Sequence, residues 1–166
     1  MIKKKICVLG AFAVGKTSLV EQYVNSIFSD EYHTTIGVKT DQKDVEYKGQ
    51  NVRLIIWDIN GEDDFQKVRP SYLIGAEGFI IIADGTRKET LDTAFELRSL
   101  AENTVGAKPV FLIINKKDLK NEWEITNEEL AELTTRYPNL LLTSAKTSEN
   151  VDKVFTLLVE EIMKNQ

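Results

Sequence analysis

The segment at residues 10–18, GAFAVGKTS, carries the residue types whose spacing most directly suggests chemistry. It follows the pattern G-x-x-x-x-G-K-[ST], in which glycines let backbone N–H groups turn inward around phosphate. Lys16 can then reach the terminal phosphates of a nucleotide, and Thr17 can ligate Mg²⁺. A chance Gly-Lys-Thr turn is the alternative, but an apolar run precedes the segment and a helical pattern follows it. The sequence therefore predicts a phosphate-binding loop.

Two later segments place polar side chains where apolar runs end. NKKD occupies residues 115–118 and TSAK occupies residues 143–146. A carboxylate such as Asp118 can accept the two N–H donors that guanine offers on its Watson–Crick edge and that adenine lacks. Alone, either segment would be an ordinary solvated loop, so the signal comes from their order and spacing after the phosphate loop.

The elements that must position these residues alternate between strands and helices. Continuous apolar runs at 6–9, 79–83 and 110–114 predict strands covered on both faces, as in a parallel sheet. Helices are predicted over 88–103, from Thr126 with its capping partner Glu129 to about 137, and over 151–162. Remaining predicted elements are a helix with apolar residues at 19, 20, 23, 24 and 27, a charged edge strand over 38–47, a turn at 48–49, and strands over 52–58 and 140–143.

This alternation predicts a single domain over residues 1–166 with an α/β sheet wound on both faces. In such sheets ligands bind at the carboxyl ends of the strands. The phosphate-binding loop and the segments at 115–118 and 143–146 all fall at such ends.

Composition and charge exclude several classes of protein. A net charge of −5 argues against broad nucleic-acid binding. The only cysteine, Cys7, cannot form an intrachain disulfide and is expected to be a small core residue. The three lysines at 3–5 are expected to be a solvated strand flank. No signal peptide, lipidation site or membrane-length apolar run is recognisable, so we expect a monomeric cytoplasmic protein without an encoded membrane anchor.

Together these segments resemble those of the Ras superfamily of small GTPases, most closely its Rab branch, over essentially the whole sequence. TIGVKT at 35–40 is similar to the first switch of Rab proteins, and LIIWDINGEDDF at 54–65 to the second. SYLIGAEGFIIIADGT at 71–86 is similar to the strand that follows. The resemblance implies a P-loop NTPase with a Ras-like three-layer fold, a six-stranded and mostly parallel sheet, GTP or GDP with Mg²⁺ as ligands, and effector and regulator proteins at the switches.

The resemblance also implies a role for individual residues. The metal ligands would be Thr17, Thr35 and, through water, Asp58. The remaining nucleotide contacts would come from the phosphate-loop residues Gly10, Ala13, Val14, Gly15, Lys16 and Ser18, from Phe28 on the edge of the base, from the Gly61 backbone at the γ-phosphate, and from the base-binding residues Asn115, Lys116, Asp118, Ser144, Ala145 and Lys146.

Hydrolysis is where the sequence departs from the family pattern. Glu62 replaces the glutamine that orients the attacking water, and Asn60 replaces the usual alanine. Phe12 and Ala13 replace residues that are mostly small, although Phe12 could equally be a loop residue that points to solvent. With Lys16, Thr35 and Gly61 as the other catalytic groups, we expect slow GTP hydrolysis. Two alternatives stay open: a nucleotide-loaded interaction module with almost no hydrolysis, and an ATP-using P-loop kinase, against which NKKD and TSAK argue.

The sequence gives weaker predictions for the roles of four other side chains. His33 is expected to be a mobile loop residue, and Trp57 a packing residue. Arg69 could act as an arginine supplied in cis, although most such arginines are simply solvated. Trp123 is expected in a loop without an assigned role.

Overall fold

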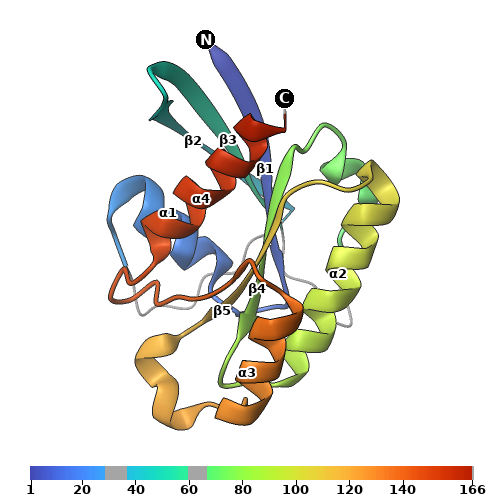
Figure 1. Cartoon of the computed structure of the whole chain (residues 1–166), viewed down its shortest axis with the longest axis vertical. Coiled ribbons are helices and arrows are strands. Elements are labelled where there is room, and N and C mark those ends of the chain that lie inside the picture. Colours follow the sequence, from blue (N-terminus) through green and yellow to red (C-terminus); the bar gives the residue numbers. More distant parts are fainter. Residues whose placement is uncertain (29–36, 60–66, 166) are drawn as a thin grey trace.

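A six-stranded sheet forms the middle layer of the molecule (Figure 1). The computed structural model describes residues 1–28, 37–59 and 67–165. The strands run in the order β2-β3-β1-β4-β5-β6, with β2 antiparallel to β3 and the other neighbours parallel. This confirms the predicted, mostly parallel sheet with one antiparallel edge strand. Their bounds are β1 (Ile2–Gly10), β2 (Val38–Tyr47), β3 (Gln50–Ile59), β4 (Gly78–Asp84), β5 (Val110–Asn115) and β6 (Leu140–Leu142).

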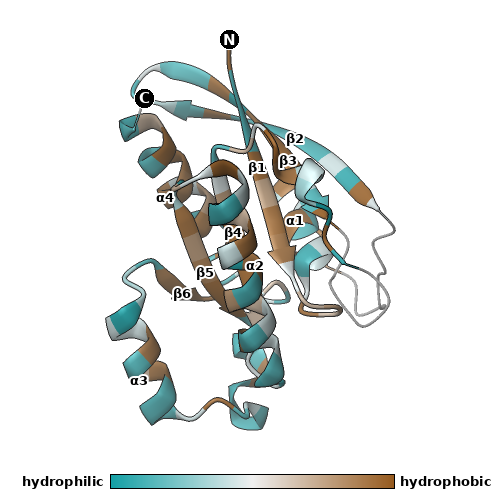
Figure 2. Cartoon of the chain, turned by 90° about the vertical axis from the view of Figure 1, so that its right-hand side faces the viewer, coloured by the Kyte–Doolittle hydropathy of each residue, from teal (hydrophilic) through white to brown (hydrophobic). Residues whose placement is uncertain are grey.

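Helices cover both faces of this sheet. Two buried clusters result: α1 and α4 pack on one face, and α2 and α3 on the other. Successive residues of β1 alternate between them, with Ile6 and Val8 facing α1 and α4, and Cys7 and Leu9 facing α2 and α3. Figure 2 shows the central strands as predominantly hydrophobic ribbons between helices that carry many hydrophilic residues. The helices are α1 (Lys16–Asn25), α2 (Glu89–Val105), α3 (Asn127–Arg136) and α4 (Val151–Lys164), with short 3₁₀ turns at Pro70–Leu73 and Lys117–Glu122.

The hairpin turn and the helix capping box that the sequence predicts are both present. Lys48 and Gly49 have φ values of 47° and 80°, the left-handed pair that a tight hairpin between β2 and β3 requires. Thr126 accepts a hydrogen bond from the Glu129 N–H, and Glu129 accepts one from the Thr126 N–H. Both the hairpin turn and the capping box are therefore confirmed. No helix within the described parts of the chain is long and apolar enough to cross a membrane.

Two expectations about the first elements are wrong. Ile27 does not continue the buried stripe of α1, because Ser26 turns to a φ of 55° and ends the helix, which leaves Ile27 exposed. The lysines at 3–5 are not simply solvated either. Lys4 is buried and pairs with Glu77, and the Lys5 ammonium donates to the carbonyls of residues 72 and 74. Both ammonium groups thus fasten β1 to the segment before β4.

Candidate functional site

The polar residues of interest meet at the carboxyl ends of the parallel strands. The phosphate loop follows β1 at Gly10, and Asp58 lies near the end of β3, opposite Val8 of β1. Asp84 and Asn115 are the last residues of β4 and β5 and are partners in the sheet register. The fold therefore gathers the predicted motifs at one edge of the sheet, as expected for this class.

Within the phosphate loop, Gly15 must be a glycine. Its φ of 100° lies in the left-handed region, and a Cβ there would lie 2.4 Å from the Asn115 amide nitrogen. The glycine precedes the first residue of α1, Lys16, so the loop leads directly into a helix N-terminus. Loop N–H groups followed by a helix N-terminus suit phosphate binding. The Val14 side chain is fully buried in the core, and its N–H donates to the Ala11 carbonyl at 3.4 Å.

A buried lysine and a buried carboxylate face each other beneath this loop. Lys16 is 5% exposed, and its ammonium lies 3.9 Å from Oδ1 of Asp58, which is 0% exposed. Thr17 donates its hydroxyl hydrogen to the other carboxylate oxygen at 2.7 Å. Burial lowers the pKa of Lys16, and Asp58 offsets part of that change. Burial raises the pKa of Asp58, and the nearby Lys16 and Thr17 offset this rise only in part.

Asp58 has the property expected of a group that helps to hold Mg²⁺. Its Oδ1 is buried and accepts no hydrogen bond, which is costly for a carboxylate unless a cation or donor approaches it. Within residues 1–28, 37–59 and 67–165 no three His, Cys, Asp or Glu side chains form a cage. Mg²⁺ that is bound with a nucleotide does not need such a cage, because one or two carboxylates together with the phosphates commonly hold it. The residues present therefore fit the ion.

Asn115 joins the phosphate loop to the loop after β6. Its amide nitrogen donates to the Val14 carbonyl at 3.0 Å. Its amide oxygen accepts hydrogen bonds from the Thr143 hydroxyl at 3.0 Å and from the Ala145 N–H at 3.2 Å. Asn115 is 2% exposed. In this structure its amide thus bonds three residues from two loops, and the Ala145 N–H points to Asn115.

Asp118 is placed at the exposed rim of the same region. Ser144, which is buried, donates its hydroxyl hydrogen to Asp118 Oδ1 at 2.7 Å, so the carboxylate is fixed in direction. Lys146 is exposed in the same loop, and Phe28 is half-buried against the core cluster under α1. The structure therefore brings the NKKD and TSAK segments together as a pair, as their order along the chain predicted.

Lys116 and a carboxylate that the sequence analysis missed form a second charged centre. Lys116 has a left-handed φ of 72°, and its ammonium binds Asp84 Oδ2 at 2.8 Å and the Ala13 carbonyl at 3.2 Å. Asp84 is 0% exposed, and Thr86 donates to it through both its N–H and its hydroxyl. Burial raises the pKa of Asp84, but the hydrogen bonds from Lys116 and Thr86 outweigh burial and lower it. A charged residue that directly ends a fully buried strand was the signal available in the sequence.

Trp123 also has a role that the sequence left unassigned. Its indole N–H donates to the Lys116 carbonyl at 2.9 Å. Its ring packs against Gly85, where a Cβ would lie 2.1 Å from ring atom Cε2. Trp123 thereby holds Lys116 against the loop after β4.

Several predicted residues fall elsewhere. Thr35, Gly61 and Glu62, together with Asn60 and His33, lie outside the described residues. Phe12 has an exposed fraction of 36%, and Arg69 is exposed before the 3₁₀ turn at Pro70–Leu73.

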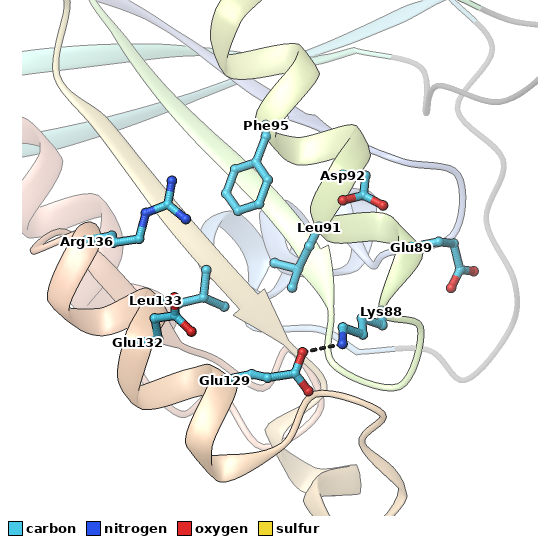
Figure 3. Close-up of a pocket in the computed structure, with 9 residues that line it drawn as sticks. All are labelled: Lys88, Glu89, Leu91, Asp92, Phe95, Glu129, Glu132, Leu133 and Arg136. Atoms are coloured by element: carbon cyan, nitrogen blue, oxygen red, sulfur yellow. Dashed lines mark ion pairs between the residues drawn. The ribbon is translucent and has the colours of Figure 1, made fainter.

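A pocket between α2 and α3 lies apart from all these groups (Figure 3). Its cavity volume is about 430 Å³, and an ion pair between Lys88 and Glu129 crosses it. Leu91, Phe95 and Leu133 form its apolar part. None of the predicted nucleotide residues lines this pocket, so it is not the candidate site.

Comparison with known proteins decides the family. The family model for the Ras family matches residues 5–164. The chain belongs to the Ras family. The predicted resemblance and the Ras-like α/β fold are thereby confirmed.

Known relatives of this Ras-family protein match it along nearly its whole length. It is 32% identical to the Ras-related protein Rab-12 of Homo sapiens over 98% of this chain and 68% of the relative. It is 34% identical to the GTP-binding protein Rheb homolog of Dictyostelium discoideum over 97% of this chain and 88% of that relative. It is also 32% identical to the Ras-related protein Rab-19 of Rattus norvegicus, over 96% of this chain and 75% of that relative. The Rab-like character is confirmed, and a Rheb protein is comparably similar.

The contact between Gly85 and Trp123 predicts a specific cost for a methyl group. Gly85→Ala should lower the free energy of unfolding by about 1–3 kcal/mol, because the indole must move off the backbone it packs on. Urea denaturation monitored by circular dichroism measures this. In a Trp123→Ala background the same substitution should cost much less, since the ring is gone. Equal costs in both backgrounds would show that Trp123 is not the obstructing group.

Proposed function

We propose that this Ras-family protein binds GTP and GDP, hydrolyses GTP slowly and acts as a nucleotide-dependent switch. The observation that carries the proposal is the Asn115 side chain, which joins the phosphate loop to the loops that hold Asp118 and Ala145. A nucleotide has a base at one end and phosphates at the other, so a site for it needs both loops at a fixed separation. The Dictyostelium discoideum relative is named as a GTP-binding protein, which supports the same ligand.

The groups at the phosphate end suit a polyphosphate. Lys16 would bind the β- and γ-phosphates, and backbone N–H groups of the loop, with those at the start of α1, would surround them. Lys16 is a buried cation whose charge Asp58 only partly compensates. An anionic phosphate would therefore strengthen the charged form of Lys16.

The residues that would hold Mg²⁺ are Thr17 and Asp58, together with Thr35 from the first switch. The ion, when bound, neutralises charge that develops on the phosphates. Thr17 and Asp58 are already joined by a hydrogen bond, so the hydroxyl and the carboxylate lie side by side. The part of Thr17 and Asp58 would be to hold the ion beside the phosphates.

The groups at the base end suit guanine. Asp118, whose direction Ser144 fixes, would accept the two N–H donors of the guanine edge. Phe28 would pack on the edge of the base, and Lys116 would lie along its face. Lys146 would support the loop.

The switch would act through Thr35 and Gly61, which would contact the γ-phosphate. Loss of the γ-phosphate on hydrolysis would change the protein surface there, so that effectors and regulators could distinguish the two states.

Glu62 is the reason to expect slow hydrolysis. A glutamine can donate to and accept from the attacking water while it stays neutral, whereas a glutamate brings negative charge toward the anionic γ-phosphate. Two unit charges ~4 Å apart repel by about 1 kcal/mol in water and about 4 kcal/mol at an effective dielectric of 20. Since ~1.4 kcal/mol is a factor of ten in rate, the loss would span one to three decades.

The nucleotide carried by the purified protein tests the proposal. We expect denatured protein to release guanine nucleotide, identified by chromatography against standards. GDP supports binding with turnover or exchange, and GTP as the dominant species would support the interaction module with almost no hydrolysis. Adenine nucleotides in its place would contradict the proposed function.

Base recognition predicts the behaviour of Asp118→Asn. An asparagine offers a donor where guanine needs an acceptor, so GTP binding should weaken by at least tenfold and xanthosine triphosphate should become preferred. Titration calorimetry with both nucleotides measures this, and Asp92→Asn on the exposed side of α2 is the matched control. An unchanged GTP affinity in Asp118→Asn would remove Asp118 from the base site.

The charge argument predicts that Glu62→Gln accelerates hydrolysis by about 10- to 1000-fold. Single-turnover GTP hydrolysis measures it, with Glu132→Gln on α3 as the matched control. Phe12→Gly is measured beside it with and without an activating protein, and a larger stimulation than in the wild type would show that the ring obstructs an activating arginine, whose help is worth ~10³ to 10⁵ in rate. If Glu62→Gln instead hydrolyses GTP more slowly than the wild type, Glu62 acts as a base and its charge is not what slows hydrolysis.

A further inference from the structure

Arg87, in the loop between β4 and α2, contacts the phosphate loop although it lies far from it in the sequence. Its Nη2 donates to the Phe12 carbonyl at 2.5 Å, and its Nε donates to Asp84 Oδ2 at 3.2 Å. One guanidinium therefore bridges a buried carboxylate and the backbone of the loop that would surround the phosphates.

The backbone of Arg87 is itself held in place. Its N–H donates to the Asp84 carbonyl at 3.0 Å. Its carbonyl accepts hydrogen bonds from the Thr90 N–H at 3.0 Å and from the Thr90 hydroxyl at 2.7 Å. Thr90 is 1% exposed, so the donor end of these bonds is shielded from water. The side chain thus extends from a fixed point, which lowers the entropy cost of holding its contact.

A second cation makes the same kind of contact one residue further along. Lys116 binds the same oxygen of Asp84 and donates to the Ala13 carbonyl. Two consecutive carbonyl groups of the phosphate loop are therefore held by two cations that share one carboxylate. Asp84 can neutralise only one of them, so a net positive charge remains beside the loop, where it favours an anion.

The direction of one loop donor follows from this contact. In a planar trans peptide the carbonyl oxygen of one residue and the N–H of the next point in opposite directions. Because Arg87 holds the Phe12 oxygen, the Ala13 N–H must point the other way. Ala13 has a left-handed φ of 64°, as in turns that present backbone N–H groups to an anion, while the next N–H, that of Val14, donates to the Ala11 carbonyl at 3.4 Å.

We propose that Arg87 is a positioning residue of the phosphate loop: it orients the Phe12–Ala13 peptide for phosphate binding and slows the release of nucleotide. This inference rests on the proposed guanine-nucleotide binding. It differs from an arginine that acts on the reaction, because it assigns Arg87 to the backbone of the loop.

Release of a fluorescent GDP analogue into excess GDP, measured by stopped flow, tests the proposal. Arg87→Ala should speed release about tenfold, the size expected for one hydrogen bond with a charged donor. Arg87→Lys, which keeps the charge but cannot bridge both acceptors in the same way, should be intermediate. Arg98→Ala removes the same side chain from α2, where it lies over Tyr137, and should release GDP as the wild type does. The ratio of GDP to xanthosine diphosphate affinity should stay unchanged in all three variants.

A spectroscopic readout separates positioning from a general loss of stability. The backbone amide resonance of Ala13 should shift in Arg87→Ala, recover in part in Arg87→Lys and stay in place in Arg98→Ala. Wild-type release rates and an unmoved Ala13 resonance in Arg87→Ala would overturn the proposal. Unchanged release with a loss of single-turnover hydrolysis would overturn it too, and would assign Arg87 to the reaction. If the wild type binds no guanine nucleotide, the proposed function fails, and the Ala13 resonance still tests the contact.

Discussion

The burial of Asn115 is the constraint on which the site depends. A fully buried amide must have both its nitrogen and its oxygen satisfied, and the partners of Asn115 come from the loop after β1 and the loop after β6. Because these loops share one side chain, the two ends of the proposed nucleotide site cannot separate without exposing buried polar atoms. The sheet order, which places β1, β4, β5 and β6 side by side, is what lets one residue reach both loops.

Two buried carboxylates at the same edge of the sheet have opposite electrostatic balances. Asp84 is surrounded by Lys116, Arg87 and Thr86, and its pKa is lowered. Burial raises the pKa of Asp58, and Lys16, Thr17 and Lys39 offset that rise only in part. The first carboxylate is complete within the chain and acts as an anchor for cations. The second has coordinating capacity to spare, which is the property that a divalent ion and phosphate would use.

Sequence patterns predicted the elements and the position of the site, because both depend on short-range chemistry. Apolar runs at 79–83 and 110–114 fix buried strands, and polar residues at their ends fix the edge where a ligand binds. The patterns missed Asp84 and Trp123, whose importance lies in contacts with residues far along the chain. The patterns also failed at Ile27, because helical periodicity does not reveal where a helix stops. They failed at Lys4, because a run of charged residues does not reveal which ammonium group has a buried partner. The roles of Thr35, Gly61 and Glu62 remain predictions from the sequence.

Lys116 combines a strained backbone with a stabilising ion pair. A non-glycine residue in the left-handed region is strained by roughly 1–2 kcal/mol, and a glycine would relax this backbone. A glycine would also remove the ammonium that Asp84 and the Ala13 carbonyl bind. The strain at residue 116 is therefore offset by an ammonium that compensates the buried Asp84 carboxylate, since removing one partner of a buried ion pair is strongly destabilising. Lys116 therefore serves stability and the proposed site at once, because a glycine that relaxed this backbone would leave Asp84 buried with less compensation of its charge.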